Sequence, residues 1–306
     1  MSSRLNELSL AGIKFLGYSQ AGEETVLAAP ELNVCFDVGR APRQIISIDH
    51  VLLTHGHMDH AAGLAYYFSQ RAFVGNSPGI MLMPRPLVPW ANAIMQAWAG
   101  MEGHPSPANI IGLEPGQDYT LRRGVIVRSF AVHHGSPALG YSLIEVRRKL
   151  KPELLGKPQH QIVALKRQGA EIEYTLEVPL IAFCGDTAVG DFFDLPYVRS
   201  ARVLVLECTF FEPQHIRRAR AGHHLHINDL ASLLDRLDNQ AILMTHLTRR
   251  TTIRQARKIL QRLVGRQAAQ TIHFLMERPR VPSAPAEQPS KADCSSHTPN
   301  RPSNQN

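Results

Sequence analysis

The segment T-H-G-H-M-D-H concentrates side chains that bind metal ions. His55 and His57 lie two residues apart, so on an extended chain their side chains leave the same side. Asp59 and His60 follow, and a turn of the chain would direct them toward a second point. Imidazole nitrogens and carboxylate oxygens are the ligands of zinc, or of manganese where carboxylates dominate. The spacing therefore predicts a centre that serves two metal ions.

Two ions need more ligands than one loop supplies, so the others must come from distant parts of the chain. Three candidates directly follow apolar, strand-like runs: His134 after S-F-A-V-H, Asp186 after L-I-A-F-C-G, and His246 after A-I-L-M-T. Each alone is more typical of a turn or a cap than of a ligand, but together with the histidine-rich segment they favour ligands. Asp37 also ends a strand-like run, and we expect it either to orient a histidine through its free ring nitrogen or to form a turn.

Strand-like and helix-like segments alternate along the chain and would place these residues at the ends of strands. Helices are expected at 61–72, 86–101, 226–238, with a cap near Asn228, and 251–266. Strands are expected at 13–19, 25–30, 33–38, within 45–53, and at 125–135, 141–146, 179–187, 201–210 and 240–247. This alternation is typical of an α/β protein.

The chain has 306 residues, of which 44% are hydrophobic, enough to fill the core of one large domain and to exclude a wholly disordered protein. We expect one domain over 1–277, with a basic insertion at 147–177 formed by two short helices, and a disordered tail rich in Pro, Ser and Asn at 278–306. The insertion carries seven basic residues: Arg147, Arg148, Lys149, Lys151, Lys157, Lys166 and Arg167.

Composition also limits the class of protein. Four cysteines without a C-x-x-C pair exclude a disulfide framework and a thiolate zinc finger, so histidines and carboxylates must hold any metal. No apolar stretch reaches the roughly 18 residues of a membrane span, and no secretory signal is recognised, which predicts a cytoplasmic protein. Lys and Arg outnumber Asp and Glu by 33 to 26, a net charge of +7 that favours an anionic partner such as RNA, or reflects surface charge alone.

Several motifs, taken in order, resemble those of the metallo-β-lactamase superfamily. They are F-D-V-G at 36–39, T-H-G-H-M-D-H, H-G-S-P-A-L-G-Y at 134–141, C-G-D-T, E-C-T-F and M-T-H-L-T-R-R. The third motif, followed by G-D-T and T-H-L-T-R-R, is similar to the ribonuclease Z family, which trims the 3′ end of precursor tRNA. The resemblance implies an α/β fold, the αββα sandwich of two mixed β-sheets flanked by helices.

The resemblance also implies roles for individual residues. One zinc ion would be held by His55, His57 and His134, the other by Asp59, His60 and His246, and Asp186 would bridge them. A water or hydroxide between the ions would attack phosphorus, and Asp59 would orient it. The leaving ribose oxygen would be protonated by His224, paired with Glu207, and His226 competes for this role.

Two departures from the family pattern keep alternatives open. The chain has F-D-V-G-R-A-P-R-Q, with Arg40 where the family usually has an acidic residue, and the 147–177 insertion is shorter than the Gly- and Pro-rich arm of many bacterial members. A hydrolase of a small phosphodiester, a lactone or a thioester is therefore the alternative function, and a catalytically inactive RNA-binding scaffold is a third. Manganese in place of zinc, and a homodimer, which members of the family tend to form, are left open by the sequence.

Overall fold

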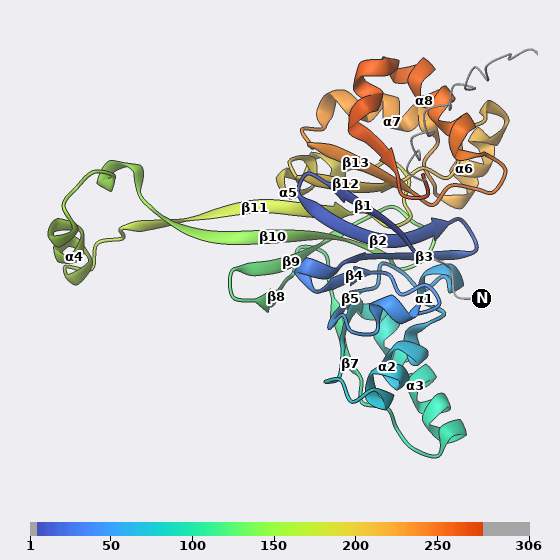
Figure 1. Cartoon of the computed structure of the whole chain (residues 1–306), viewed down its shortest axis with the longest axis horizontal. Coiled ribbons are helices and arrows are strands. Elements are labelled where there is room, and N and C mark those ends of the chain that lie inside the picture. The colour runs from blue at the N-terminus through green and yellow to red at the C-terminus, as the bar shows by residue number, and fades with distance from the viewer. Residues whose placement is uncertain (1–4, 278–306) are drawn as a thin grey trace, which may run out of the picture.

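The computed structural model describes residues 5–277, so the predicted tail at 278–306 lies outside the described residues. Two seven-stranded sheets pack face to face, and helices cover their outer surfaces (Figure 1). No helix within 5–277 combines the length and apolar character needed to cross a membrane. The αββα sandwich expected from the sequence is confirmed.

The first sheet contains the strands of the N-terminal part in chain order: β1 (Asn6–Leu10), β2 (Ile13–Gln20), β3 (Glu24–Ala29), β4 (Val34–Phe36), β5 (His50–Leu52), β6 (Ile80–Pro84) and β7 (Asn109–Leu113). Pairing is antiparallel from β1 to β4 and parallel from β4 to β7. Because parallel strands end at the same edge of a sheet, the residues after β4 and β5 meet: the Thr54 N–H donates to Asp37 Oδ1 at 2.7 Å.

The second sheet runs in the order β14 to β8: β14 (Ile272–Phe274), β13 (Ala241–Thr245), β12 (Val203–Glu207), β11 (Glu173–Phe183), β10 (Leu139–Leu150), β9 (Val125–Ala131) and β8 (Asp118–Arg122). β11 to β14 are parallel, and β8 to β11 are antiparallel. Asp186 follows β11, Thr209 follows β12 and His246 follows β13, so the same edge collects all three residues.

An apolar layer fills the space between the sheets. Phe36 of β4 and Phe183 of β11 stack across it with ring centroids 4.8 Å apart. Along β2, buried and half-buried residues alternate, the pattern of a strand with one face on a core. Outside the first sheet lie α2 (Leu64–Phe73) and α3 (Val88–Glu102), and outside the second lie α7 (Ile227–Leu233) and α8 (Ile253–Ala268). The two packed sheets, each covered by helices on its outer face, thus support one edge at which the ends of their strands meet.

Three short helices, α1 (Met58–Ala61), α5 (Pro196–Arg199) and α6 (Ile216–Gly222), lie in the connections. Every strand and helix expected between 13 and 266 is present, apart from the insertion, but five strands were not predicted: β1, β6, β7, β8 and β14. Four of these are the edge strands of the two sheets. Of these, β1, β7 and β8 bury few side chains, so their hydrophobic pattern is weak, and β14 has only three residues. β6 is a short run rich in methionine, which has no strong strand preference.

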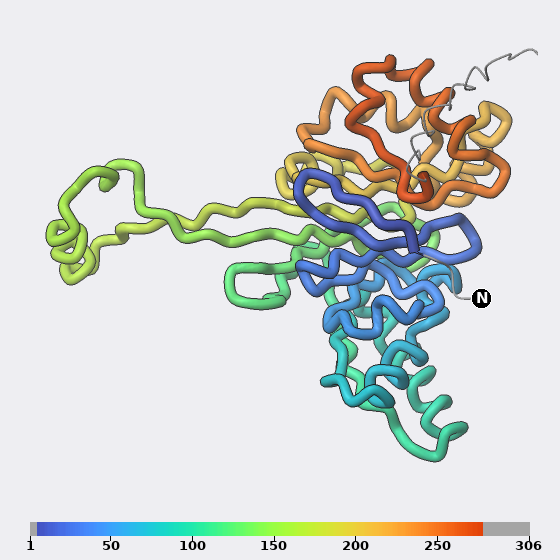
Figure 2. Tube along the Cα trace, viewed as in Figure 1, coloured from blue at the N-terminus to red at the C-terminus, as the bar shows by residue number. Residues whose placement is uncertain are grey.

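The 147–177 segment matches the two short helices expected there only in part: the second is present as α4 (Gln159–Arg167), the first is reduced to a 3-10 turn, and the flanking residues are strands. β10 and β11 leave the sheet and continue as a two-stranded arm, in which pairing extends from Arg147↔Leu176 to Leu150↔Glu173 (Figure 2). Only the tip is helical, with a 3-10 turn at Pro152–Leu154 and α4 at Gln159–Arg167. Since both faces of the arm meet solvent, its strands have no alternation of apolar and polar residues that the sequence could reveal.

Candidate metal centre

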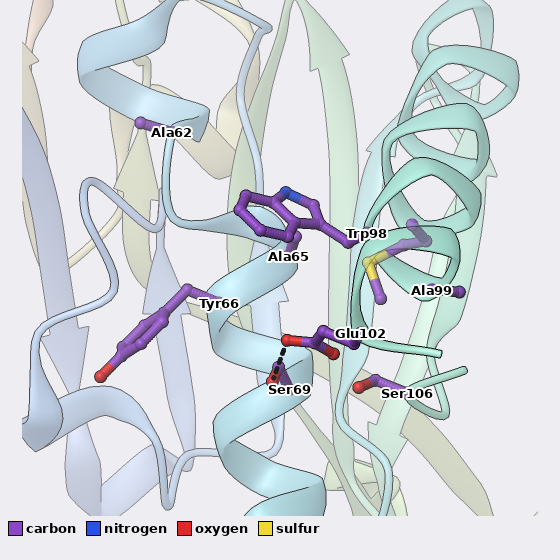
Figure 3. Close-up of a pocket in the computed structure, with 9 residues that line it drawn as sticks. Ala62, Ala65, Tyr66, Ser69, Trp98, Ala99, Glu102 and Ser106 are labelled. Carbon is purple, nitrogen blue, oxygen red and sulfur yellow. Dashed lines mark hydrogen bonds between the residues drawn. The ribbon is translucent and has the colours of Figure 1, made fainter. Parts of the chain in front are cut away.

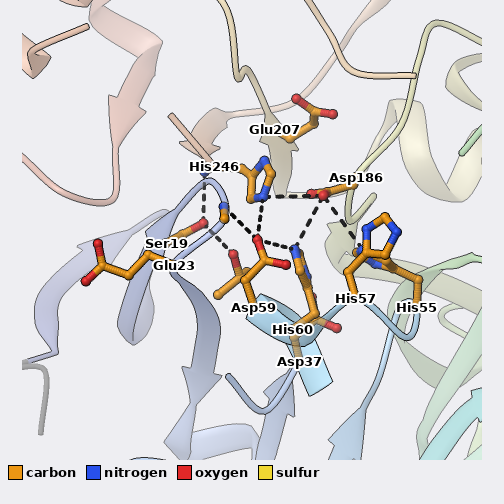
Figure 4. A network of polar contacts seen from close by, with 12 residues as sticks. Ser19, Glu23, Asp37, His55, His57, Asp59, His60, Asp186, Glu207 and His246 are labelled. Atoms are coloured by element: carbon orange, nitrogen blue, oxygen red, sulfur yellow. Dashed lines mark hydrogen bonds and ion pairs between the residues drawn. The ribbon is translucent and has the colours of Figure 1, made fainter. Parts of the chain in front are cut away.

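The predicted ligands converge at the shared edge of the two sheets (Figure 4). Three groups of side chains could each hold a metal ion, with the ligand atoms of each group within 4.8 Å of one another. Two match the predicted sets, His55, His57, His134 and Asp186, and Asp59, His60 and His246, and the third is Asp186, His224 and His246. Asp186 stands between the groups. Its Oδ2 lies 3.8 Å from His55 Nε2, 3.4 Å from His60 Nε2 and 3.3 Å from His246 Nε2. The side chains that the sequence singled out are therefore neighbours in space.

Asp37 fixes the orientation of two of these histidines. His60 donates its Nδ1 proton to Asp37 Oδ2 at 2.7 Å. The Thr54 hydroxyl donates to the same carboxylate at 2.8 Å and accepts from His55 Nδ1 at 3.0 Å. Because both Nδ1 atoms carry the proton, both Nε2 atoms present a lone pair to the site. The prediction that Asp37 orients a histidine is confirmed by this contact.

Glu207 plays the matching part on the second sheet. The Thr209 hydroxyl donates to Glu207 Oε2 at 2.7 Å and accepts from His246 Nδ1 at 2.9 Å. Glu207 Oε1 accepts from the Thr187 N–H at 3.0 Å and from His224 Nδ1 at 2.8 Å. The buried Glu207 carboxylate thus aligns one histidine of the metal-binding group and, directly, His224.

The geometry and electrostatics of the site suit a bound cation. His55 Nε2 and His60 Nε2 are buried and have no hydrogen-bond partner, an arrangement that is costly unless a metal ion or a proton satisfies them. Burial and the neighbouring His60 hold the pKa of His55 well below its usual range. Burial would raise the pKa of Asp186, but His246 and His60 hold it well below the usual range, so the carboxylate is ionised. Imidazole nitrogens around an anionic carboxylate oxygen match the donor set of zinc.

His224 and His226, the two candidates for protonating a leaving group, have different surroundings. The His224 ring stacks on His246 with centroids 5.3 Å apart, and its contact with Glu207 leaves Nε2 available. His226 is buried and caps α7: its Nδ1 accepts the Asn228 N–H at 3.2 Å, and its Nε2 contacts the Glu212 carbonyl. The cap expected near Asn228 is therefore two residues earlier, because an imidazole nitrogen replaces the usual side-chain oxygen.

Sequence reasoning missed the supporting polar residues. Thr54, Thr187 and Thr209 each stand inside a motif that was identified, immediately next to a predicted ligand or within two residues of Glu207. Their hydroxyls and amides link ligands to carboxylates, a role that only the folded arrangement reveals. Ser19 and Gly22, which contact His246 and Asp59, belong to the β2–β3 hairpin and carry no signal in the sequence.

Replacing Glu207 by Gln should lower the pKa of His224. Burial opposes protonation of this ring, but the Glu207 carboxylate raises the pKa of His224 to about 9. The protonated pair therefore stabilises the metal-free fold fully below about pH 6.5, the unfolded value, and this contribution is lost as pH rises through about 9. Histidine NMR titration of metal-free protein, with His224→Asn to assign the signal, should give a clearly lower pKa for His224 in Glu207→Gln than in the wild type. Equal titration in both proteins would contradict the assigned pairing.

Comparison with known proteins agrees with this geometry. Residues 26–247 match the model of the beta-lactamase superfamily domain. The chain is 30% identical over 251 residues to tRNase Z TRZ1 of Arabidopsis thaliana, which covers 81% of this chain and 90% of that protein. It is 26% identical over 223 residues to ribonuclease Z of Staphylococcus carnosus, covering 66% of this chain and 71% of that protein.

Solved structures share the fold. The metallo-beta-lactamase fold protein YhfI from Bacillus subtilis superposes with a TM-score of 0.57 at 14% identity, over 84% of this chain and 92% of that one. Human tRNase Z, short form, superposes with a TM-score of 0.52 at 13% identity, over 88% and 93%. With a family model matching most of the chain and a relative of nearly full length, the protein belongs to the ribonuclease Z family of the β-lactamase superfamily.

Proposed function

We propose that the protein is a two-metal phosphodiesterase that removes the 3′ trailer of precursor tRNA. The observation that carries the proposal is the position of Asp186 Oδ2, within 4 Å of imidazole nitrogens from both ligand groups. One ion would be held by His55, His57 and His134, and the other by Asp59, His60 and His246, with Asp186 shared. The nitrogen-rich donor set favours zinc over manganese. The precursor tRNA substrate is supported by the names of the relatives.

Different residues of the site would carry out different parts of the reaction. When bound, the two ions would supply the Lewis acidity that activates water and offsets negative charge on the phosphoryl oxygens. Asp59 would orient the attacking water, and its own position is fixed by the Gly22 N–H at 2.8 Å. His224, kept protonated by Glu207, would deliver a proton from Nε2 to the leaving ribose oxygen. His226 is a poor donor because both of its ring nitrogens are engaged.

A cleavage assay tests this function. Zinc- or manganese-loaded protein should cut a 3′-extended precursor tRNA after the discriminator nucleotide, far faster than it cuts a generic phosphodiester. Asp59→Ala should abolish cleavage because it removes both a ligand and the orienting carboxylate, whereas Asp235→Ala, at an exposed aspartate on the outer surface, should leave the rate unchanged. Cleavage of the small phosphodiester alone would favour the small-molecule hydrolase instead, and no cleavage of either would support an inactive RNA-binding scaffold.

The arm would bind RNA phosphates at a distance from the site. Arg147 and Lys151 are paired with Glu145 and Glu171, at 2.7 and 3.1 Å. The other five basic residues of the segment are exposed around the strands and tip of the arm: Arg148, Lys149, Lys157, Lys166 and Arg167. Exposed cations on an arm that projects from the core could contact a part of the tRNA remote from its 3′ end (Figure 1).

Neutralising Lys149, Lys157, Lys166 and Arg167 with Gln should weaken RNA binding and flatten its salt dependence. Each phosphate contact that is lost lowers the slope of log K against log salt by about 0.7 to 0.9. Binding of an uncleaved precursor tRNA is measured over a range of salt concentrations. A variant with the same charge change on α8, at Arg254, Lys258, Arg262 and Arg266, is the matched control. Equal slopes in the arm variant and the wild type would discard the role of the arm.

We also propose that two copies associate through α3. Both tryptophans of the chain, Trp90 and Trp98, lie on this helix with Ile94 and Met101, and all four are exposed, Trp90 by 71%. α3 has no charged residue before Glu102. Trp98 also lines a shallow pocket against Tyr66 of α2 (Figure 3). An apolar, uncharged helix face is typical of an isologous dimer interface.

Light scattering after size exclusion should therefore show a dimer, and Trp90→Glu with Trp98→Glu should give a folded monomer. Charged side chains in a buried apolar interface are strongly unfavourable. Leu263→Glu, at an exposed leucine of α8, is the control and should remain dimeric. A monomeric wild-type protein at micromolar concentration would contradict this interface.

We also propose that the protein is cytoplasmic. Cys35, Cys184 and Cys208, the cysteines within 5–277, are free and buried. Unpaired thiols are typical of reducing compartments, which supports the location expected from the sequence.

A further inference from the structure

The β2–β3 hairpin turn, defined here as residues 19–24, lies against the second ligand group (Figure 4). The Gly22 N–H donates to Asp59 Oδ2 at 2.8 Å, and the His246 N–H donates to the Ser19 hydroxyl at 2.9 Å. The Ala21 N–H donates to the Leu247 carbonyl at 3.1 Å. One turn, far from the metal-binding motifs in sequence, therefore contacts two of the three residues that would hold one ion.

The Ser19 contact supports an unfavourable backbone conformation. His246 has a φ of +59°, in the left-handed region that a non-glycine residue adopts only at a cost. Ser19 is buried, and its hydroxyl also contacts the Thr25 hydroxyl at 3.1 Å, so its position is fixed from both sides. By binding the His246 amide, Ser19 keeps the imidazole directed toward Asp59 and Asp186, each 3.3 Å from its Nε2.

Two arginines from other segments of the chain stabilise the turn through polar contacts. Arg249, three residues after His246, forms an ion pair with Glu23. Arg40, three residues after Asp37, donates to the Glu23 carbonyl at 3.0 Å, and its N–H donates to Glu24 Oε1 at 3.0 Å. Arg40 is the residue that departs from the usual family motif. The turn is thus tied to the segments that follow both β4 and β13.

We propose that this hairpin turn is the positioning element of the Asp59, His60 and His246 group, and sets its affinity for a divalent cation. Ser19 and the Gly22 amide hold His246 and Asp59, and the Glu23–Arg249 pair holds the turn in place. The other group, His55, His57 and His134, is held instead by Thr54 and by the loops that carry it. The inference rests on the proposed two-metal function.

Zinc affinity is measured by competition with a chromogenic chelator, on wild type, on Glu23→Gln and on Ser19→Ala. Two background variants show which of the two ions a substitution affects. His57→Ala leaves the Asp59, His60 and His246 group complete, whereas Asp59→Ala leaves the His55, His57 and His134 group complete. In the first background Glu23→Gln should weaken binding up to about fivefold, the range of an exposed ion pair. Ser19→Ala should weaken binding about tenfold or more. In the second background neither should change affinity.

The charge swap Glu23→Arg with Arg249→Glu should recover most of the affinity that Glu23→Gln loses. Asp238→Asn, which breaks the exposed Arg199–Asp238 pair far from the hairpin, is the control and should have no effect. Thermal unfolding confirms that each variant is folded. If wild type binds two ions and both variants retain wild-type affinity, or weaken both ions equally, the positioning role is wrong. A wild type that binds fewer than two ions contradicts the two-metal function itself, independently of the hairpin.

Discussion

A single buried carboxylate oxygen, Asp186 Oδ2, lies within 4 Å of ring nitrogens from His55, His60, His246 and His224. A cluster of buried carboxylate and imidazole groups that form few hydrogen bonds with one another is unfavourable in a protein interior unless a cation is present. The fold brings these side chains together. The two sheets end their parallel strands at a common edge, so the loops after β5, β11 and β13, together with the β9–β10 loop that carries His134, bring the candidate ligands together from distant parts of the chain.

Two equivalent relays, each a carboxylate hydrogen-bonded to a threonine and a histidine, orient the histidines of the site. Asp37 in one sheet and Glu207 in the other each accept a threonine hydroxyl that in turn accepts from a histidine, and each also accepts directly from a second histidine. In both relays the Nδ1 proton is fixed and Nε2 faces the centre. We propose different roles for the two histidines that the carboxylates bind directly: His60, beside Asp37, would bind a metal ion, whereas His224, beside Glu207, would donate a proton. Similar hydrogen bonding would thus position a ligand in one sheet and a proton donor in the other.

The sequence predicts which side chains gather at this edge because short motifs place imidazoles and carboxylates directly after apolar strands, as with His134 and Asp186. It predicts the interior strands for the same reason. It fails at the edge strands β1, β7 and β8 and at the strands of the arm, where burial is slight, and at β14, which has only three residues. The partners that orient the ligands are also hidden, since Ser19 meets His246 across 227 positions of chain and no local pattern records that contact.

The most direct test is a crystal structure of zinc-loaded protein with anomalous scattering recorded at the zinc edge. The account predicts two peaks of comparable height on either side of the Asp186 carboxylate, one bound by His55, His57 and His134, the other by Asp59, His60 and His246. A single peak, or peaks remote from Asp186, would contradict the claim that this carboxylate joins two metal ions.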